Sequence, residues 1–258
     1  MRNNRYIFWL ITSLFFAIVG CTSDSENQTK LIKNVVETSD SGTVQTTNYT
    51  YNGTQLMAIE SPDTLKEFTY DSGYITAIVT TDKVKNEKSL VNYTYESGFL
   101  KRVELGGSYY ITYTQNADNT VSYQKMDTKA YPLETKIYHG TLKLKDGNML
   151  SEERILDNSA GVISKYTVSY EYDSKTNPLH NIEGYDKLWD HEGIISNNNY
   201  LISTVETTVE SNGQIISSAT YYKNNFKYDK ASYPVEKNSL MSIPHKGISI
   251  SLNTVYNY

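Results

Sequence analysis

The stretch KEFTYDSGYITAI, at Lys66–Ile78, belongs to a series of related segments and decides the fold. Its aromatic pair, Phe68 and Tyr70, is followed by the turn residues DSG at 71–73 and then by an apolar run. Alternation with a period of two places the two aromatic side chains on one face of a β-strand. A glycine in the turn supplies the positive φ that a tight reversal needs. The stretch therefore predicts a β-hairpin.

Variants of this unit recur through most of the chain. Copies with an aromatic pair and a glycine turn begin at Tyr49 and Tyr93, and weaker copies follow. No segment of ten or more residues has a convincing helical period, and the spacing between copies varies too much for a solenoid or propeller. We therefore expect an all-β, antiparallel meander of repeated hairpins with about 13–16 strands, which forms one large twisted or curled sheet. An open barrel and a two-layer arrangement both fit this pattern.

The first 20 residues have the features of a secretory leader. Arg2 and Arg5 precede a short apolar run, and the residues IVG at 18–20 precede Cys21, the only cysteine of the chain. The apolar run is shorter than the roughly 20 residues that span a bilayer. This ending resembles a bacterial lipoprotein signal. The resemblance implies cleavage before Cys21 and attachment of acyl chains, such as palmitate, to that residue.

The chain divides on this basis into a leader, a tether and one domain. We expect residues 1–20 to be a signal peptide, residues 21–30 to hold the lipidated cysteine and a flexible tether, and residues 31–258 to form a single β-meander domain. The acidic run in the tether resembles that of Bacteroidota-type lipoproteins, so we expect attachment to the outer membrane, with display at the cell surface as an alternative. The net charge of −5 argues against nucleic acid as a partner, because nucleic acid requires a basic face.

One region departs from the hairpin pattern. Residues 173–199 read DSKTNPLHNIEGYDKLWDHEGIISNNN and contain the only tryptophan outside the leader. Long loops inside a compact domain are often functional. The densest group of acids and histidine in the chain lies here, and such side chains suit a metal or acid–base site; a solvated polar loop is the alternative that we favour. We therefore expect no catalytic residue, no metal and no cofactor. The members of this group are Asp186, Asp190, His191 and Glu192.

Aromatic side chains are the better candidates for binding. Tyrosine occurs 24 times, against 6 phenylalanines, and its flat face with a terminal hydroxyl suits stacking against a sugar ring or a peptide. Most tyrosines beside hairpin turns are expected to pack across strands. In the doublets at 109–110 and 221–222, adjacent residues point to opposite faces. Tyr110 and Tyr222, together with Trp189 in the long loop, are therefore the candidate binding residues.

A family resemblance can be stated on these residues. The unit FTYDSG at 68–73 resembles the YD repeat of secreted bacterial shell proteins, and the other copies are degenerate. With the lipoprotein signal and the passage from Tyr172 to Pro178, the chain as a whole resembles uncharacterised envelope lipoproteins of Bacteroidota type that carry a domain of unknown function. The resemblance implies a β-rich envelope lipoprotein and transfers no catalytic residue.

Two classes of function remain. The first is a lipid-anchored envelope protein that acts as a non-enzymatic binding or structural module, with a glycan, a peptide or another envelope protein as its partner. The alternative is a hydrolase that uses carboxylates of the 183–192 loop. The chain has no nucleophile elbow, no phosphate loop and no HExxH motif, which favours the first class.

Overall fold

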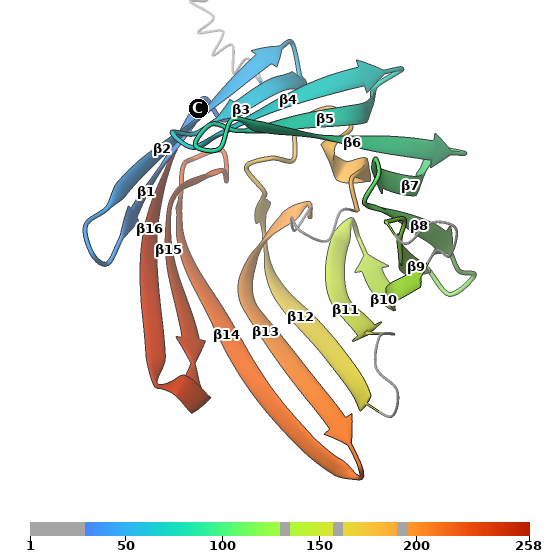
Figure 1. Cartoon of the computed structure of the whole chain (residues 1–258). Coiled ribbons are helices and arrows are strands. Elements are labelled where there is room, and N and C mark those ends of the chain that lie inside the picture. The colour runs from blue at the N-terminus through green and yellow to red at the C-terminus, as the bar shows by residue number, and fades with distance from the viewer. Residues whose placement is uncertain (1–28, 130–134, 157–161, 190–195) are drawn as a thin grey trace, which may run out of the picture.

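The computed structural model describes residues 29–129, 135–156, 162–189 and 196–258. In these residues sixteen antiparallel strands follow one another around a closed barrel, and the last strand pairs with the first (Figure 1). The predicted all-β meander is confirmed, and this last pairing closes the sheet, a point that the sequence left open. The strands are β1 (Asn34–Ser39), β2 (Val44–Asn52), β3 (Gln55–Glu60), β4 (Thr64–Asp71), β5 (Tyr74–Asp82), β6 (Glu87–Glu96), β7 (Phe99–Leu105), β8 (Tyr109–Gln115), β9 (Thr120–Asp127), β10 (Thr135–Lys145), β11 (Asn148–Leu156), β12 (Val162–Thr176), β13 (Asn198–Ser211), β14 (Gln214–Tyr228), β15 (Pro234–Ile243) and β16 (Ile248–Asn257).

The hairpin turns have the backbone that the repeated unit predicts. Ser72 and Gly73 have φ values of 50° and 82°, and two successive positive φ angles characterise the type I′ turn that suits a two-residue hairpin. The same pair of positive angles recurs at 97–98, 146–147 and 212–213. The register between β4 and β5 also shifts just before Tyr70, and a similar shift precedes Tyr95. The unit is therefore a bulged hairpin.

The second aromatic residue of the unit links neighbouring hairpins. The Tyr70 hydroxyl accepts a hydrogen bond from the backbone N–H of Leu56 at 2.9 Å. The Tyr95 hydroxyl donates to the backbone carbonyl of Ile75 at 2.9 Å. The Tyr172 hydroxyl makes an equivalent bond to β11 at 2.7 Å. Each of these phenols thus satisfies a backbone group near a bulge, where the ladder leaves such groups unpaired.

The inner face of β3–β11 is packed with side chains. Leu56, Ile75 and Leu142 are completely buried there, and residues from the long connection between β12 and β13 join the same cluster. A buried ion pair lies within this half: Glu152 is 3% exposed and accepts hydrogen bonds from Arg154 Nη2 at 2.7 Å and from the Tyr123 hydroxyl. Because both charges are paired and hydrogen-bonded, the cost of burying them is offset.

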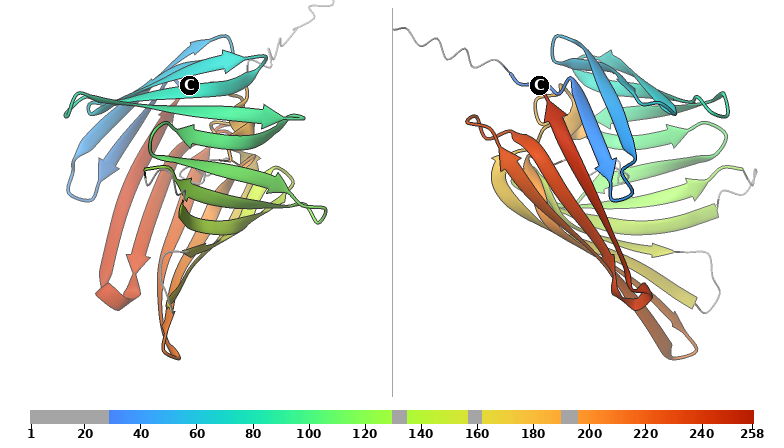
Figure 2. Two further views of the ribbon diagram at one scale, coloured as in Figure 1. Left: turned by 45° about the vertical axis from the view of Figure 1, so that its right-hand side comes forward. Right: turned by 90° about the vertical axis from the view of Figure 1, so that its left-hand side faces the viewer.

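Successive turns of the meander lie at alternate ends of the barrel, and the two ends differ. The chain enters β1 and leaves β16 at one end, here called the tether end, where Lys33 N donates to the carbonyl of Asn257 at 2.7 Å. The β12–β13 connection lies at this end too. The other end, here called the free end, carries the β13–β14 turn. The strands β12–β14 project there beyond their neighbours (Figure 2), since the pairing of β14 with β15 ends at Tyr221 and Ser242.

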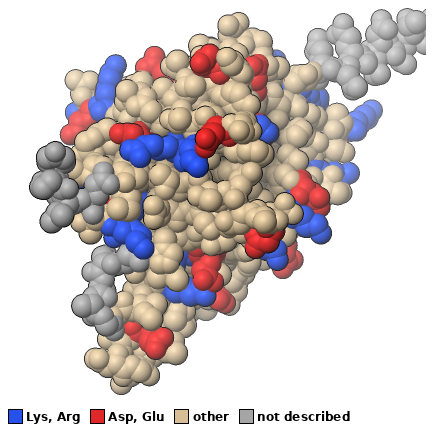
Figure 3. Space-filling view, turned by 90° about the vertical axis from the view of Figure 1, so that its right-hand side faces the viewer, with Lys and Arg blue, Asp and Glu red and all other residues tan. Residues whose placement is uncertain are grey.

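Charged side chains are spread over the outer wall. In Figure 3, Lys and Arg side chains lie next to Asp and Glu side chains, and the face in view has no continuous field of one sign. In the part of the chain that the structure describes, no helix is long and apolar enough to cross a membrane.

Candidate functional site

The long connection between β12 and β13 turns inward and partly fills the tether end of the barrel. Its first described part, residues 177–189, is here called the inner loop. Ile182 and Leu188 are each 3% exposed and belong to the apolar core. A single 3-10 turn spans Tyr185–Lys187. The departure from the hairpin pattern is therefore a packed internal segment.

Polar contacts hold the inner loop against the repeated hairpins. The Glu183 carboxylate accepts hydrogen bonds from Thr54 Oγ1 at 3.0 Å and from Gln55 Nε2 at 3.3 Å. Gly184 has a φ of 70°, and a Cβ added there would lie 2.6 Å from the carbonyl oxygen of Gly73. Only glycine fits at that position, because the backbone approaches so closely. The turn of the FTYDSG unit is thus the support on which the inner loop rests.

A groove lies between the inner loop and three hairpin turns of the tether end, and it is here called the mouth groove. Its volume is about 630 Å³, which is within the usual range of small-molecule sites. The turns β6–β7, β8–β9 and β10–β11 form its outer walls. It is lined by Phe99, Gln115, Asn116, Asn119, Thr120, Val121, Leu144, Lys145, Asp146, Gly147, Asp186, Lys187, Trp189 and Asn197.

Aromatic and amide side chains dominate the chemistry of the mouth groove. Trp189 packs against Phe99, with ring centroids 6.2 Å apart, and edge-on against Tyr113 at 6.3 Å. Phe99 remains 44% exposed, so the aromatic wall is open to solvent. The amide of Asn116 is oriented by its own hydrogen bonds, to Thr120 Oγ1 at 2.8 Å among others. The groove therefore combines an apolar ring face with pre-positioned hydrogen-bonding groups.

Two of the four charged residues that line the mouth groove, Asp186 and Lys187, pair with each other. Lys187 Nζ lies 2.7 Å from a carboxylate oxygen of Asp186, and both side chains are about half exposed. A pair of this kind contributes little stability and is weakened by salt. The two opposite charges cancel, so this pair adds no net charge to the groove.

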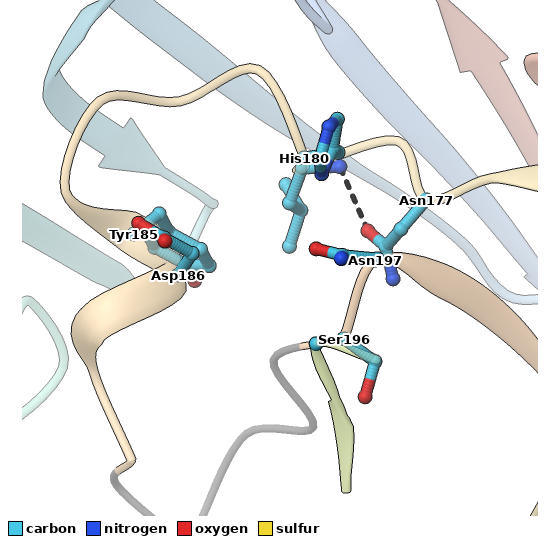
Figure 4. Close-up of a pocket in the computed structure, with 8 residues that line it drawn as sticks. Asn177, His180, Tyr185, Asp186, Ser196 and Asn197 are labelled. Carbon is cyan, nitrogen blue, oxygen red and sulfur yellow. Dashed lines mark hydrogen bonds between the residues drawn. The ribbon is translucent and has the colours of Figure 1, made fainter. Parts of the chain in front are cut away.

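Behind the groove is a small pocket that has room for about one water molecule, with a volume of about 10 Å³ (Figure 4). His180 and Asn177 lie on one side of it, joined by the hydrogen bond from the His180 backbone N–H to the Asn177 carbonyl at 3.1 Å. Asp186 lies across the pocket from them (Figure 4). The remaining residues that line it are Gly147, Leu179, Tyr185, Ser196 and Asn197.

This small pocket contains a serine, a histidine and an aspartate, but they do not form a catalytic triad. Ser196 Oγ is 2.9 Å from the Tyr172 hydroxyl and accepts a hydrogen bond from the backbone N–H of Met149 at 3.3 Å. Activation of a serine nucleophile requires a hydrogen bond from the serine to a histidine. In the described residues no hydrogen bond joins Ser196 to His180. Ser196 thus supports the wall of the barrel.

The run of three asparagines at 197–199 has a role that the sequence did not reveal. Asn198 and Asn148 exchange two hydrogen bonds, at 2.9 and 3.0 Å. Asn199 is 2% exposed, and its amide donates to the carboxylate of Asp173 and to backbone carbonyls of β12. These amides satisfy backbone and side-chain groups where the inner loop rejoins the sheet. A run of polar residues after a long loop is the only sequence signal for this role.

Two of the acids expected in the 183–192 loop can be placed. Glu183 is hydrogen-bonded to the β2–β3 turn, and Asp186 is paired with its neighbour Lys187. Asp190, His191 and Glu192 lie outside the described residues. In the described part of the chain no group of three His, Cys, Asp or Glu side chains could hold a metal ion. The use of this loop by a hydrolase remains a prediction.

Of the three aromatic candidates, only Trp189 lies in the mouth groove. Tyr110 is half-buried on the outer face of β8, since its neighbour Ile111 is 3% exposed on the inner face. The Arg102 guanidinium covers the ring of Tyr110, 3.7 Å from its centroid, in a cation–π contact. Tyr110 therefore already has a partner on its open ring face.

Tyr222 lies far from both of these residues in the fold. It is half-buried on β14 and faces inward, because it is directly opposite the buried Ser203 of β13. Tyr221 is the outward-facing member of this doublet and is 45% exposed. The structure thus does not bring Trp189, Tyr110 and Tyr222 together in one concave patch.

Comparisons with known proteins add a structural likeness. No protein-family model matches the chain, and no curated protein matches it in sequence. Among solved structures, the fold is similar to a porin-like protein from Bacteroides uniformis, with a TM-score of 0.49 and 10% sequence identity over 88% of this chain and 96% of that chain.

Proposed function

We propose that the protein is a lipid-anchored, non-enzymatic binding protein of the bacterial envelope, and that its mouth groove binds a glycan. The observation that carries this proposal is the open aromatic wall of Trp189 and Phe99 beside a row of amide side chains in a groove of about 630 Å³. A sugar ring presents an apolar C–H face and a rim of hydroxyls. The groove offers a ring for the first and amide groups for the second.

The position of the groove supports binding close to a membrane. The chain enters the barrel at the tether end, where the Lys30 carbonyl accepts a hydrogen bond from Asn181 Nδ2 of the inner loop at 2.8 Å. A tether of about nine residues reaches on the order of 15–20 Å. A barrel anchored through Cys21 therefore holds the mouth groove near the lipid surface, and a glycan attached to that surface is within reach.

Calorimetry on the full chain in detergent tests the groove. The probes are hexasaccharides of glucose, mannose, galactose, xylose and N-acetylglucosamine. We expect one class to bind, and we expect Trp189→Ala and Phe99→Ala each to weaken that binding at least tenfold, about 1.4 kcal/mol. Tyr221→Ala, which removes an exposed aromatic ring outside the groove, is the matched control. Absence of binding by every probe, or equal loss in the control, overturns the glycan proposal.

The anchor needs a separate experiment, because residues 1–28 lie outside the described part. Cys21→Ala is expected to release the protein from membranes and to abolish labelling with a fatty-acid probe. A matched Ser23→Ala variant is expected to keep both properties. Retention of the Cys21→Ala protein in the membrane fraction would overturn the lipoprotein assignment and leave the glycan proposal standing.

A further inference from the structure

A second cavity lies inside the barrel, beyond the inner loop, and is here called the inner chamber. Its volume is about 230 Å³, and it shares no lining residue with the mouth groove. An apolar cavity of about 150 Å³ already holds benzene, so the chamber has room for a somewhat larger molecule. Its walls are formed by Ile32, Val35, Glu37, Tyr49, Asn177, Pro178, Leu179, Asn199, Tyr200, Phe226, Lys237, Thr254 and Tyr256.

Strand register places two opposite charges on the wall of this chamber. Lys237 on β15 is directly opposite Thr254 on β16, and Thr254 is directly opposite Glu37 on β1. Directly opposite residues point to the same face of a sheet. Because adjacent strands lie about 4.8 Å apart, the Cα atoms of Lys237 and Glu37 are separated by about 10 Å. An ammonium group and a carboxylate therefore flank one hydroxyl.

None of these three side chains has a hydrogen-bond or ion-pair partner among the described residues. Lys237 and Glu37 are half-buried and make no hydrogen bond or ion pair there, and Thr254 Oγ1 is buried without a hydrogen-bond partner. Burial lowers the pKa of Lys237, and the Glu37 carboxylate opposes this shift. Unpaired charges in a partly enclosed cavity are costly. A bound ligand with complementary charges removes that cost.

Aromatic rings form the rest of the wall around this row. Phe226 is directly opposite Lys237, and Tyr256 follows Thr254 on the same face of β16. Tyr49 closes the side next to β1, and burial, with a contribution from Glu37, raises the pKa of Tyr49 to about 12. Burial also raises the pKa of Tyr256, so these two phenols are neutral at ordinary pH. The acidic and basic side chains that line the chamber are those of Glu37 and Lys237.

From this arrangement we propose that the inner chamber binds a small zwitterion with an apolar side chain, such as a free amino acid or a dipeptide. The Lys237 ammonium receives the ligand carboxylate, the Glu37 carboxylate receives its ammonium group, and Thr254 Oγ1 bonds between them. Phe226, Tyr49 and Tyr256 hold the apolar part. This site is separate from the mouth groove and does not depend on the glycan proposal.

The test uses three probes that share a phenyl ring and differ in which charged groups they carry. L-Phenylalanine carries both charges, 3-phenylpropanoate lacks the ammonium group and 2-phenylethylamine lacks the carboxylate. Each is titrated by calorimetry into the full chain in detergent. We expect L-phenylalanine to bind at least tenfold more tightly than either analogue. Because the analogues have nearly the same apolar part, the difference reports the two charged contacts.

Substitutions assign each contact to a residue. Lys237→Met should abolish the preference for L-phenylalanine over 2-phenylethylamine and keep its preference over 3-phenylpropanoate. Glu37→Gln should do the reverse. Lys227→Met, which removes an exposed lysine from the outer face of β14, should change neither preference. A loss of folding lowers all affinities together and so cannot imitate this crossed pattern.

Three results with these probes and variants overturn the inference. They are the absence of L-phenylalanine binding to the unsubstituted chain, equal affinity of the three probes, and preferences that are unchanged in both Lys237→Met and Glu37→Gln. Binding that depends on Trp189 and not on Lys237 also overturns it, because it places the zwitterion in the mouth groove.

Discussion

The two halves of the barrel wall use their inner faces differently. On β3–β11 the inward positions carry large apolar side chains, and Leu56, Ile75 and Leu142 are completely buried. On β12–β16 the buried inward positions include small polar residues such as Ser203 and Thr254. Both halves are built from alternating strands, so the alternation itself does not decide whether the interior is filled. The size and polarity of the inward residues decide it.

The difference has a consequence for binding. Strands β3–β11, here called the filled half, form a packed support together with the inner loop. Each candidate cavity lies where that packing stops: the mouth groove at the tether end and the inner chamber against β14–β16 and β1. A binding site needs a fixed wall and an unfilled space. This barrel provides both with a single sheet.

The free end of the barrel also differs from β3–β11, because large apolar side chains are exposed there. Ile215 and Ile216 are 65% and 71% exposed on opposite faces of β14, and residues 214–220 pair only with β13. An unpaired edge that contributes little to the core is expected to open more readily than the filled half.

Alkaline pH acts on many buried phenols at once. Burial raises the pKa of Tyr70 to about 12 and that of Tyr172 to about 12. In the unfolded chain, tyrosine hydroxyls lose their protons near pH 10. The free energy of unfolding is therefore at its full value below pH 10 and falls as the pH rises toward 12. We expect the urea midpoint to fall steeply over this interval, together with a rise in tyrosinate absorbance. A constant midpoint up to pH 12 would contradict the buried-tyrosine packing.

Glu152→Ala tests the buried ion pair of the filled half. It leaves the Arg154 charge partly buried without its carboxylate, and breaking such a pair costs about 3–5 kcal/mol. Urea unfolding measures the change. The control is Glu60→Ala, which breaks the surface pair with Lys83 and is expected to cost less than about 1 kcal/mol. Equal effects of the two substitutions would show that the buried ion pair between Glu152 and Arg154 does not stabilise the fold more than a surface pair does.

Leu56→Ala compares the filled half with the free end directly. Leu56 is 0% exposed, and truncation of a buried leucine costs about 2–5 kcal/mol. Ile216→Ala removes a similar amount of apolar surface from a side chain that is 71% exposed, and we expect a change within about 0.5 kcal/mol. If the Ile216 variant loses as much stability as the Leu56 variant, the free end is covered by something in solution.

Gly140→Ala tests the close packing of strands in the filled half. A Cβ at Gly140 would lie 2.3 Å from the carbonyl oxygen of Glu153 and 2.5 Å from the Tyr123 hydroxyl. We expect a loss of about 1–3 kcal/mol from overpacking. Gly106→Ala is the matched control, since nothing lies within 4 Å of a Cβ there, and thermal unfolding should separate the two. A neutral Gly140→Ala would mean that both the backbone at Glu153 and the side chain of Tyr123 shift without cost.

Much of the fold could be predicted from the sequence. The turn at Ser72 and Gly73 has the predicted positive φ. The predicted alternation before this turn is confirmed, since Phe68 is 5% exposed and its neighbour Thr69 is exposed on the other face. These features are local, because they depend on residues close in the sequence. Closure of the barrel depends on β1 and β16, which are more than 200 residues apart, and no local pattern specifies such a pairing.

The sites were less accessible to prediction, for the same reason. Trp189 could be selected because it lies in the segment that breaks the hairpin pattern. Phe99 and Asn116 lie in ordinary hairpin turns, and only the tertiary structure places them opposite Trp189. Lys237 and Glu37 come from strands at opposite ends of the chain, so their juxtaposition has no signal in the sequence.

The most direct test of glycan binding uses Trp189 as its own reporter. The Trp9→Phe chain contains a single tryptophan, and its emission is recorded while the same hexasaccharides are added. We predict a saturable shift of emission with one saccharide class and none with the others, because the sugar ring displaces water from the indole face. Binding of that class by calorimetry without any change in Trp189 emission, or no response to every class, would contradict the assignment of the mouth groove as the binding site.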